Sequence, residues 1–254
     1  MMLGKTLEEM NVTINEWKNF GIMAFYSIVP AIFIVIQPDM GMTMVLFFMV
    51  VGIFFIAGLD MKIIGGGLLT LIVAIVIVWN SGIIQDYQKT RITSFMNPES
   101  DSSESGYQLR QSLISIGNGG ILGLQGNSIT KENSVSYAAQ YVPEVQTDFI
   151  FASIAEQWGL LGACFLLLLY GILISRMVAI ARTSKDTFGS IISVGLVAYF
   201  LFALLQNIGM TIGLMPITGI TLPLISYGGT SLLTTVMSIG LILNIGMRRK
   251  KIYF

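Results

Sequence analysis

The amino-acid sequence predicts an all-α, polytopic integral membrane protein with about six transmembrane helices. Only 11% of its 254 residues are charged and 54% are hydrophobic, whereas a soluble domain usually has about 25% charged residues. Several apolar runs also approach the roughly 20 residues that a helix needs to cross a hydrocarbon core. The candidate spans are Phe20–Ile36, Met42–Leu59, Ile63–Trp79, Phe149–Ser175, Phe188–Leu214 and Leu222–Gly246.

The spans divide the chain into five parts, and a polar stretch rich in Ser, Asn, Gln and Gly separates the third span from the fourth. This stretch is the one extramembrane region that is large enough for a site of its own. The expected parts are a cytoplasmic or interfacial segment (1–19), three transmembrane helices (20–79), a large extracytoplasmic loop (80–147), three further transmembrane helices (148–247) and a basic cytoplasmic tail (248–254).

The placement of Lys and Arg predicts the orientation. The C-terminal stretch "MRRKK" should be cytoplasmic because basic residues are enriched on that side of membrane proteins. Six spans then put the N-terminus in the cytoplasm as well. Ten of the 14 basic residues fall inside, and the polar loop lies outside with four basic residues and a surplus of acids.

Composition excludes several kinds of chemistry. The absence of histidine removes His-based general bases, His metal sites and the Ser-His-Asp triad. The single cysteine, Cys164, cannot form an intramolecular disulfide. A formal net charge of zero provides no field that would attract nucleic acid, which is not an expected partner.

The stretch "YVPEVQTDFIFASIAEQWG" places Asp148 at the mouth of an apolar run, with Glu144 one turn earlier and Glu156 two turns further in. An acid at this position is favoured by the helix macrodipole alone. The alternative is a general base, because partial desolvation makes a carboxylate more basic. Glu156 is a candidate functional group because ionisable residues inside a membrane are costly. The alternative for Glu156 is an interhelical hydrogen bond.

The stretch "MPITGITLPLISYGGTS" interrupts another apolar region. Its prolines predict a break near Pro216–Pro223, and its glycines predict a second one at Gly228–Gly229. Freed backbone N–H groups could receive an anionic head group, which makes residues 226–229 candidate substrate contacts. The alternative is a kink that only shapes packing. The substrate-binding candidates here are Ser226, Tyr227, Gly228 and Gly229.

The polar loop supplies three candidate phosphate contacts, Arg91, Arg110 and Lys131, which could instead be ordinary loop charges. Its glycines, at 117, 119, 120 and 123, indicate backbone bends or close approach, but their spacing does not match a nucleotide-binding fingerprint. No metal site is assigned. A divalent cation could bind to Asp39, Glu144 and Asp148 only if folding brought these acids together.

Several stretches together closely resemble the SEDS family (shape, elongation, division and sporulation), whose members include RodA, FtsW and SpoVE. In order, they are "QPDMGM", "YQKTRITSFMNPE…GYQLRQSLISIGNGG", "PEVQTDFIFASIAEQWG", "QNIGMTIGLMPITGITLPLISYGGTS" and the basic tail. The resemblance covers nearly the whole chain from about Phe20. Members often have a second acid where this chain has Gln157.

The resemblance implies a peptidoglycan glycosyltransferase that polymerises lipid II at the outer face of the bacterial cytoplasmic membrane. It implies that Asp148, in "TDFIF", is the catalytic acid, and that the partners are lipid II, undecaprenyl-pyrophosphate-linked glycan and a class B penicillin-binding protein transpeptidase. Two alternatives remain open at this point. One is a flippase for the lipid-linked precursor, which would use the buried Glu156, and the other is a non-catalytic scaffold for the transpeptidase.

Members of the family have more spans than this chain, which resembles their C-terminal part. The expectation is that the 254-residue chain alone is inactive or nearly so. Six spans would leave the broken stretch around Pro223 without the neighbouring helices that a lipid-sugar cavity needs.

Overall fold

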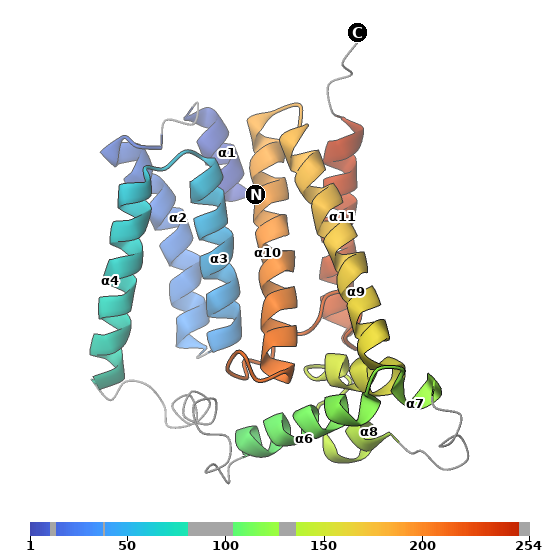
Figure 1. Cartoon of the computed structure of the whole chain (residues 1–254). Coiled ribbons are helices and arrows are strands. Elements are labelled where there is room, and N and C mark those ends of the chain that lie inside the picture. Colours follow the sequence, from blue (N-terminus) through green and yellow to red (C-terminus); the bar gives the residue numbers. More distant parts are fainter. Residues whose placement is uncertain (11–13, 38, 81–103, 127–135, 249–254) are drawn as a thin grey trace. The chain divides into compact units, whose positions relative to one another are not determined.

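The computed structural model describes residues 1–10, 14–37, 39–80, 104–126 and 136–248, and each regular element in these ranges is a helix (Figure 1). The prediction of an all-α fold is therefore confirmed for the part of the chain that is described. The helices are α1 (Met2–Glu9), α2 (Trp17–Ile36), α3 (Met40–Ile56), α4 (Met61–Asn80), α6 (Glu104–Gly119), α7 (Gly123–Gly126), α8 (Tyr137–Tyr141), α9 (Ile150–Arg182), α10 (Thr187–Thr211) and α11 (Gly229–Met247).

Six of these helices overlap the six apolar runs, but the last run, Leu222–Gly246, begins before α11 because residues 222–228 form no helix. Among the described residues, α2, α9, α10 and α11 are long and apolar enough to cross a membrane. Helix α3 is a shorter apolar helix, and so is the part of α4 at residues 61–70. The protein is thus a polytopic membrane protein, while the number of spans, six, stays a prediction.

The chain forms two compact units. The first contains Met1–Ile84, Ile174–Phe202 and Met237–Phe254, and the second contains Gln85–Leu173 and Ala203–Val236. Helices α9, α10 and α11 contribute residues to both units. Asp148 and Glu156 belong to the second unit, so the second unit is the one that positions the candidate site.

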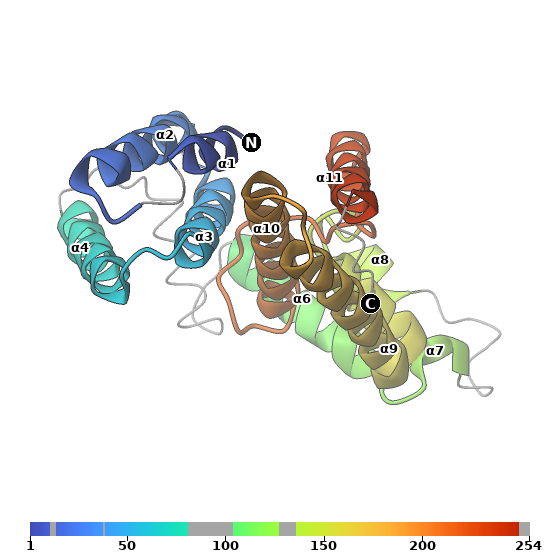
Figure 2. The same cartoon turned by 90° about the horizontal axis from the view of Figure 1, so that it is seen from above.

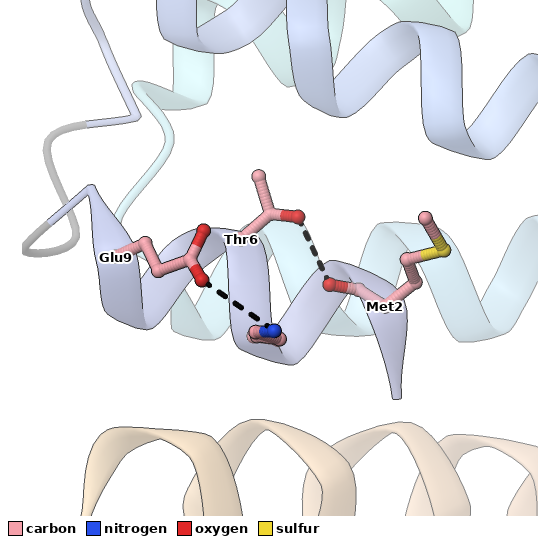
Figure 3. Close-up of polar contacts among 4 residues, drawn as sticks. Met2, Thr6 and Glu9 are labelled. Atoms are coloured by element: carbon pink, nitrogen blue, oxygen red, sulfur yellow. Dashed lines mark hydrogen bonds and ion pairs between the residues drawn. The ribbon is translucent and has the colours of Figure 1, made fainter.

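In the first unit, α1 packs its apolar side against α2 and the start of α10. Leu7 has no exposed surface, and a Cβ at Gly4 would lie 3.2 Å from the Phe188 ring. The opposite side of α1 is polar, with Thr6 donating a hydrogen bond to the carbonyl of Met2 at 3.0 Å and an ion pair between Lys5 and Glu9 at 3.8 Å (Figure 3). This short helix is therefore amphipathic, and its polar side adds little stability because exposed ion pairs are weak.

The turn between α3 and α4 is held by one side chain from the segment after α1. The Asn15 amide donates to the carbonyl of Gly58 at 3.1 Å and accepts from the N–H of Asp60 at 3.0 Å. Gly58 has a φ of +79°, which an L residue adopts only with strain. Figure 2 shows α2, α3 and α4 side by side, and Asn15 fixes the turn that joins the last two.

In the second unit, α9 is interrupted near its start. The sequence predicts one continuous run over Phe149–Ser175, but Gly159 has non-helical torsions (φ 68°, ψ −168°). The interruption frees two backbone donors, and the α6–α7 junction supplies their acceptors. The N–H of Leu160 donates to the carbonyl of Gly120 at 2.9 Å, and the N–H of Leu161 donates to the carbonyl of Ile121 at 3.2 Å.

This contact between α9 and the α6–α7 junction is made by backbone atoms and needs glycine on both sides. A Cβ at Gly119 would lie 2.1 Å from the carbonyl oxygen of Ala155, and one at Gly123 would lie 2.2 Å from that of Gln157. A Cβ at Gly159 would lie 2.3 Å from the nitrogen of Gly123. The close approach expected from the glycines of the polar loop is thus present at positions 119 and 123.

A second interruption separates α10 from α11. Residues 212–228 form no helix, which confirms the predicted break at Pro216–Pro223. The second break, predicted at Gly228–Gly229, is not separate, because α11 begins at Gly229 where this same stretch ends. Proline at positions 216 and 223 removes backbone donors, and Gly213 and Gly219 adopt φ values of +76° and +73°. We call residues 212–228 the interhelical segment.

We predict that Gly123→Ala destabilises the protein by at least about 2 kcal/mol, because the new Cβ would collide with backbone and the residue has a positive φ. The φ is +75°. The measurement is the thermal unfolding midpoint of purified protein in detergent. Gly171→Ala is the matched control, since nothing lies within 4 Å of a Cβ at that position on α9. Equal midpoints for the two variants would contradict the proposed backbone contact.

Candidate functional site

The residues just before α9 are held by donors from other segments. The carbonyl of residue 146 accepts a hydrogen bond from the N–H of Tyr227 at 2.8 Å. The carbonyl of residue 147 accepts from the hydroxyl of Ser226 at 2.5 Å, and that of residue 148 accepts from the side-chain amide of Asn207 at 2.8 Å. The backbone around Asp148 is therefore attached both to α10 and to the interhelical segment.

A turn at Glu144 brings the chain into this position. Its carbonyl oxygen accepts from the N–H groups of Thr147 (3.2 Å), Asp148 (3.0 Å) and Phe149 (3.2 Å). Glu144 has a φ of 52°, and its exposed carboxylate accepts from the Thr147 hydroxyl at 2.9 Å. The local sequence thus forms a compact turn in front of α9, one turn before the candidate base.

Asp148 is half-buried beside the interhelical segment. A Cβ at Gly219 would lie 3.2 Å from Asp148 Oδ2, so the absence of a side chain at residue 219 leaves room next to the carboxylate. The neighbouring Thr218 hydroxyl is buried without a hydrogen-bond partner among the described residues. Buried apolar residues from α6, α8 and α10, from the turn before α9 and from this segment pack together at the start of α9: Leu109, Ala138, Val142, Phe149, Met210 and Ile217.

Glu156 is fully buried and serves as an anchor for two other helices. Its carboxylate accepts four hydrogen bonds, from the hydroxyls of Ser115 (3.3 Å) and Ser136 (2.7 Å) and from the N–H groups of Tyr137 (2.6 Å) and Ala138 (2.9 Å). Three of these donors belong to the N-terminus of α8, where the orphan N–H groups favour an anion. Glu156 therefore joins α9 to α6 and α8. Of the two interpretations from the sequence, these contacts favour an interhelical hydrogen-bonding role.

The other predicted site residues are more dispersed. Tyr227 is 75% exposed, although its backbone is anchored beside Gln146. Gly228 is half-buried and Gly229 begins α11. Arg110 lies exposed on α6, where its side chain donates to the carbonyl of Gly106 in the same helix at 3.3 Å. Arg91 and Lys131 lie outside the described residues.

The part of the chain that the structure describes offers no cluster of metal ligands, and Asp148 does not line the cavity in the first unit. Within the described ranges, no three His, Cys, Asp or Glu side chains lie close enough together to hold a metal ion. A cavity of about 340 Å³ in the first unit is lined by polar residues of the α9–α10 turn, including Arg182, Lys185 and Asp186. None of the site residues predicted from the sequence lines this cavity, so Asp148 and its neighbours remain the candidate site.

Comparison with known proteins identifies the family. The FtsW/RodA/SpoVE model, described as a cell cycle protein, matches residues 1–251. The chain belongs to this family. The SEDS resemblance inferred from the motifs is thereby confirmed.

Among the curated relatives of this SEDS chain, "Peptidoglycan glycosyltransferase MrdB" of Escherichia coli K12 is 36% identical over 236 residues, which are 92% of this chain and 61% of MrdB. "Stage V sporulation protein E" of Bacillus subtilis 168 is 36% identical over 246 residues, which are 96% of this chain and 64% of that protein. The chain therefore spans less than two thirds of the length of these relatives.

Solved structures agree in fold. A chain from a peptidoglycan synthase complex superposes with a TM-score of 0.80 at 29% identity, over 98% of this chain and 67% of that one. The Thermus thermophilus rod shape determining protein RodA gives a TM-score of 0.64 at 26% identity, over 98% of this chain and 62% of RodA. The polytopic helical fold of the SEDS family therefore extends across the chain.

We predict that Glu156→Gln lowers the stability of the second unit by roughly 3 kcal/mol, because an amide nitrogen would face donors that now share a buried carboxylate. The measurement is the thermal unfolding midpoint in detergent, together with the rate at which a protease cleaves near α8. Glu8→Gln is the control, since Glu8 is exposed on α1. A midpoint and cleavage rate equal to those of the control would show that the carboxylate does not hold α8.

Proposed function

We propose that this SEDS protein polymerises lipid II into glycan strands at the outer face of the cytoplasmic membrane. The observation that carries the proposal is the position of Asp148, a half-buried carboxylate in the "TDFIF" stretch whose backbone is fixed by donors from α10 and the interhelical segment. Family membership and relatives named as peptidoglycan glycosyltransferases support it.

In the proposed reaction, Asp148 is the general base. Its carboxylate accepts the proton of the 4-hydroxyl of one lipid II as that oxygen attacks the anomeric carbon at the lipid-linked end of the growing chain. The glycosidic bond forms as the bond to undecaprenyl pyrophosphate breaks. The fixed position suits this role, because a general base must lie within hydrogen-bond reach of the proton that it accepts.

Substrate contacts are proposed for residues around Asp148. The exposed Tyr227 ring offers an apolar face for a sugar, and its backbone is fixed by the bond to Gln146. Glu144 offers an exposed acceptor, while Gly228 and Gly229 leave the start of α11 without bulky side chains. Ser226 would act indirectly, because its hydroxyl already donates to Thr147 and accepts from the N–H of Leu222.

The pyrophosphate of the leaving group needs positive charge to offset its own. Arg110 is the proposed contact within the described residues, and Arg91 and Lys131 are the proposed contacts beyond them. A divalent cation remains an expectation from the sequence. Since the described residues include no group of three metal ligands, no step of the proposed reaction is assigned to a metal.

We further propose that the chain works with a class B penicillin-binding protein transpeptidase and binds undecaprenyl-linked glycan. Support comes from its similarity to a chain in a peptidoglycan synthase complex. The proposed orientation places both termini in the cytoplasm and α6–α8 outside, as the distribution of Lys and Arg indicates.

We predict that Asp148→Asn reduces polymerisation by about 100-fold or more, because it removes the general base while preserving size. The measurement is the formation of glycan chains from fluorescent lipid II by protein reconstituted in liposomes, with and without the co-expressed N-terminal spans of a SEDS relative. Asp39→Asn is the matched control, since Asp39 caps α3 by accepting from the N–H of Met42 at 2.9 Å and Asn caps equally well.

Two outcomes would contradict the proposed function. One is polymerisation by Asp148→Asn at the rate of the Asp39→Asn control. The other is transport of labelled lipid II across the liposome membrane with no glycan formed by either variant, which would favour the flippase alternative.

We predict that a cysteine at Gln140 reacts with a membrane-impermeant maleimide in intact spheroplasts, while a cysteine at Thr183 reacts only after lysis. Both positions are exposed, on α8 and just after α9. The substitutions are made in a Cys164→Ser background, because Cys164 is itself exposed. Labelling of Thr183→Cys before lysis, with Gln140→Cys protected, would reverse the proposed orientation.

A further inference from the structure

Asn207 is a buried amide that makes two hydrogen bonds to two different segments. It lies on α10 with no exposed surface. Its Nδ2 donates to the carbonyl of Asp148 at 2.8 Å and to the carbonyl of Ile220 at 2.8 Å. One side chain therefore attaches the start of α9 and the interhelical segment to the same point on α10.

This arrangement leaves the amide oxygen without a partner. Asn207 Oδ1 is buried and accepts no hydrogen bond among the described residues. A buried acceptor without a partner costs free energy, so packing alone does not account for an asparagine at this position. The two N–H groups of the amide offset this cost, because each donates to one of the two segments that meet at Asp148.

The neighbouring residue provides a comparison. Gln206 is also buried on α10, and its Nε2 donates to the carbonyl of Pro216 at 2.8 Å. Gln206 thus attaches the interhelical segment to α10 without contacting residues 146–148. If Asn207 served only to attach that segment, the bond to Asp148 would be unnecessary.

The bond to Ile220 also explains how Gly219 reaches the carboxylate. Residue 219 is next to 220, has a φ of +73° and would place a Cβ 3.2 Å from Asp148 Oδ2. Asn207 fixes Asp148 on one side and the residue after Gly219 on the other. Ser226 and Tyr227 also join the segment to residues 146 and 147, but Asn207 is the side chain that binds both Asp148 itself and the residue next to Gly219.

We propose that Asn207 is a positioning residue that holds the Asp148 carboxylate against the Gly219 backbone, where the acceptor hydroxyl is to be bound. The effect on catalysis rests on the proposed function, but the effect on geometry does not. Asn207 does not touch substrate in this proposal. It acts through the position of Asp148, and misplacement of a catalytic group by about 1 Å can reduce a rate by about 100-fold.

The geometry is tested by disulfide trapping in full-chain protein carrying Asp148→Cys, Gly219→Cys and Cys164→Ser. Disulfides need Cβ atoms about 3.5–4.5 Å apart, and a Cβ at residue 219 would approach Asp148 Oδ2 to 3.2 Å. Adding Asn207→Leu, which keeps the branched shape of the side chain but removes both donors, should slow oxidant-driven disulfide formation by about 10-fold or more, because the two segments would separate locally. Gln206→Leu, the matched control, should leave the rate within about 2-fold.

The catalytic effect is tested with Asp148 and Gly219 intact. In the lipid II assay, Asn207→Leu should lower kcat by at least about 10-fold while KM changes by less than about 3-fold, since substrate binding is retained and only the base is misplaced. Gln206→Leu should retain both constants. Asn207→Ser, which keeps one donor, should give an intermediate disulfide rate and an intermediate kcat.

The outcomes separate this inference from the proposed function. Disulfide rates that are equal in the parent, in the Asn207→Leu variant and in the Gln206→Leu control would overturn the positioning role, whatever the activity. If Asn207→Leu slows the disulfide, and the protein with Asp148 and Gly219 intact makes no glycan in the lipid II assay, the positioning role is supported and the polymerase is rejected. If Asn207→Leu does not yield monodisperse protein, Asn207→Ser replaces it, and a disulfide rate for Asn207→Ser equal to that of the parent overturns the inference.

Discussion

The second unit depends on the interruption of α9 at Gly159. A helix that stops and restarts leaves backbone donors without partners, and a buried donor without an acceptor is costly. Here the carbonyls of Gly120 and Ile121 accept from Leu160 and Leu161. These acceptors reach the break only because no side chain separates the two backbones at the glycines of the contact. The same contact fixes residues 150–158, between Asp148 and the break, against α6 and α7.

A buried carboxylate completes this arrangement. Glu156 lies in the nine residues before the break, and its four donors are all neutral groups. Removing a carboxylate from water is expensive unless its oxygens are well supplied with hydrogen bonds. The N-terminus of α8 offers such bonds together with a favourable dipole. Glu156 accepts hydrogen bonds from both α6 and α8. The interruption of α9 and the positions of these two helices therefore depend on one another.

Much of this fold could be predicted from the sequence. Composition and the lengths of the apolar runs predict membrane helices, and prolines 216 and 223 predict the break after α10, because proline removes a donor wherever it stands. The interruption at Gly159 was not predicted. Glycine is tolerated inside membrane helices, so "QWGLLG" gives no local sign of a break. The deciding contact comes from Gly123, which is distant in sequence.

The candidate site, too, could be predicted only in part, because some of its contacts join residues that are distant in sequence. Asp148 could be proposed from its place before an apolar run, and the motif resemblance then singled it out. Asn207, Thr218 and Gly219 were not proposed, although the dipeptide Gln206–Asn207 within an apolar run was an available sign of buried polar contacts. Which carbonyls those amides reach depends on the path of residues 212–228. No periodicity in the sequence specifies that path.

The irregular segment also fits the chemistry proposed for it. A general base is effective when its position is fixed before the substrate arrives, since the cost of ordering is then met by folding. Three donors hold the backbone of residues 146–148, and two of them come from Ser226 and Tyr227 in the interhelical segment. The interior of a regular helix could not supply a backbone donor such as the Tyr227 N–H, because its backbone N–H groups are used internally. The break after α10 therefore provides the groups that fix the proposed base, while Gly219 leaves space beside its carboxylate.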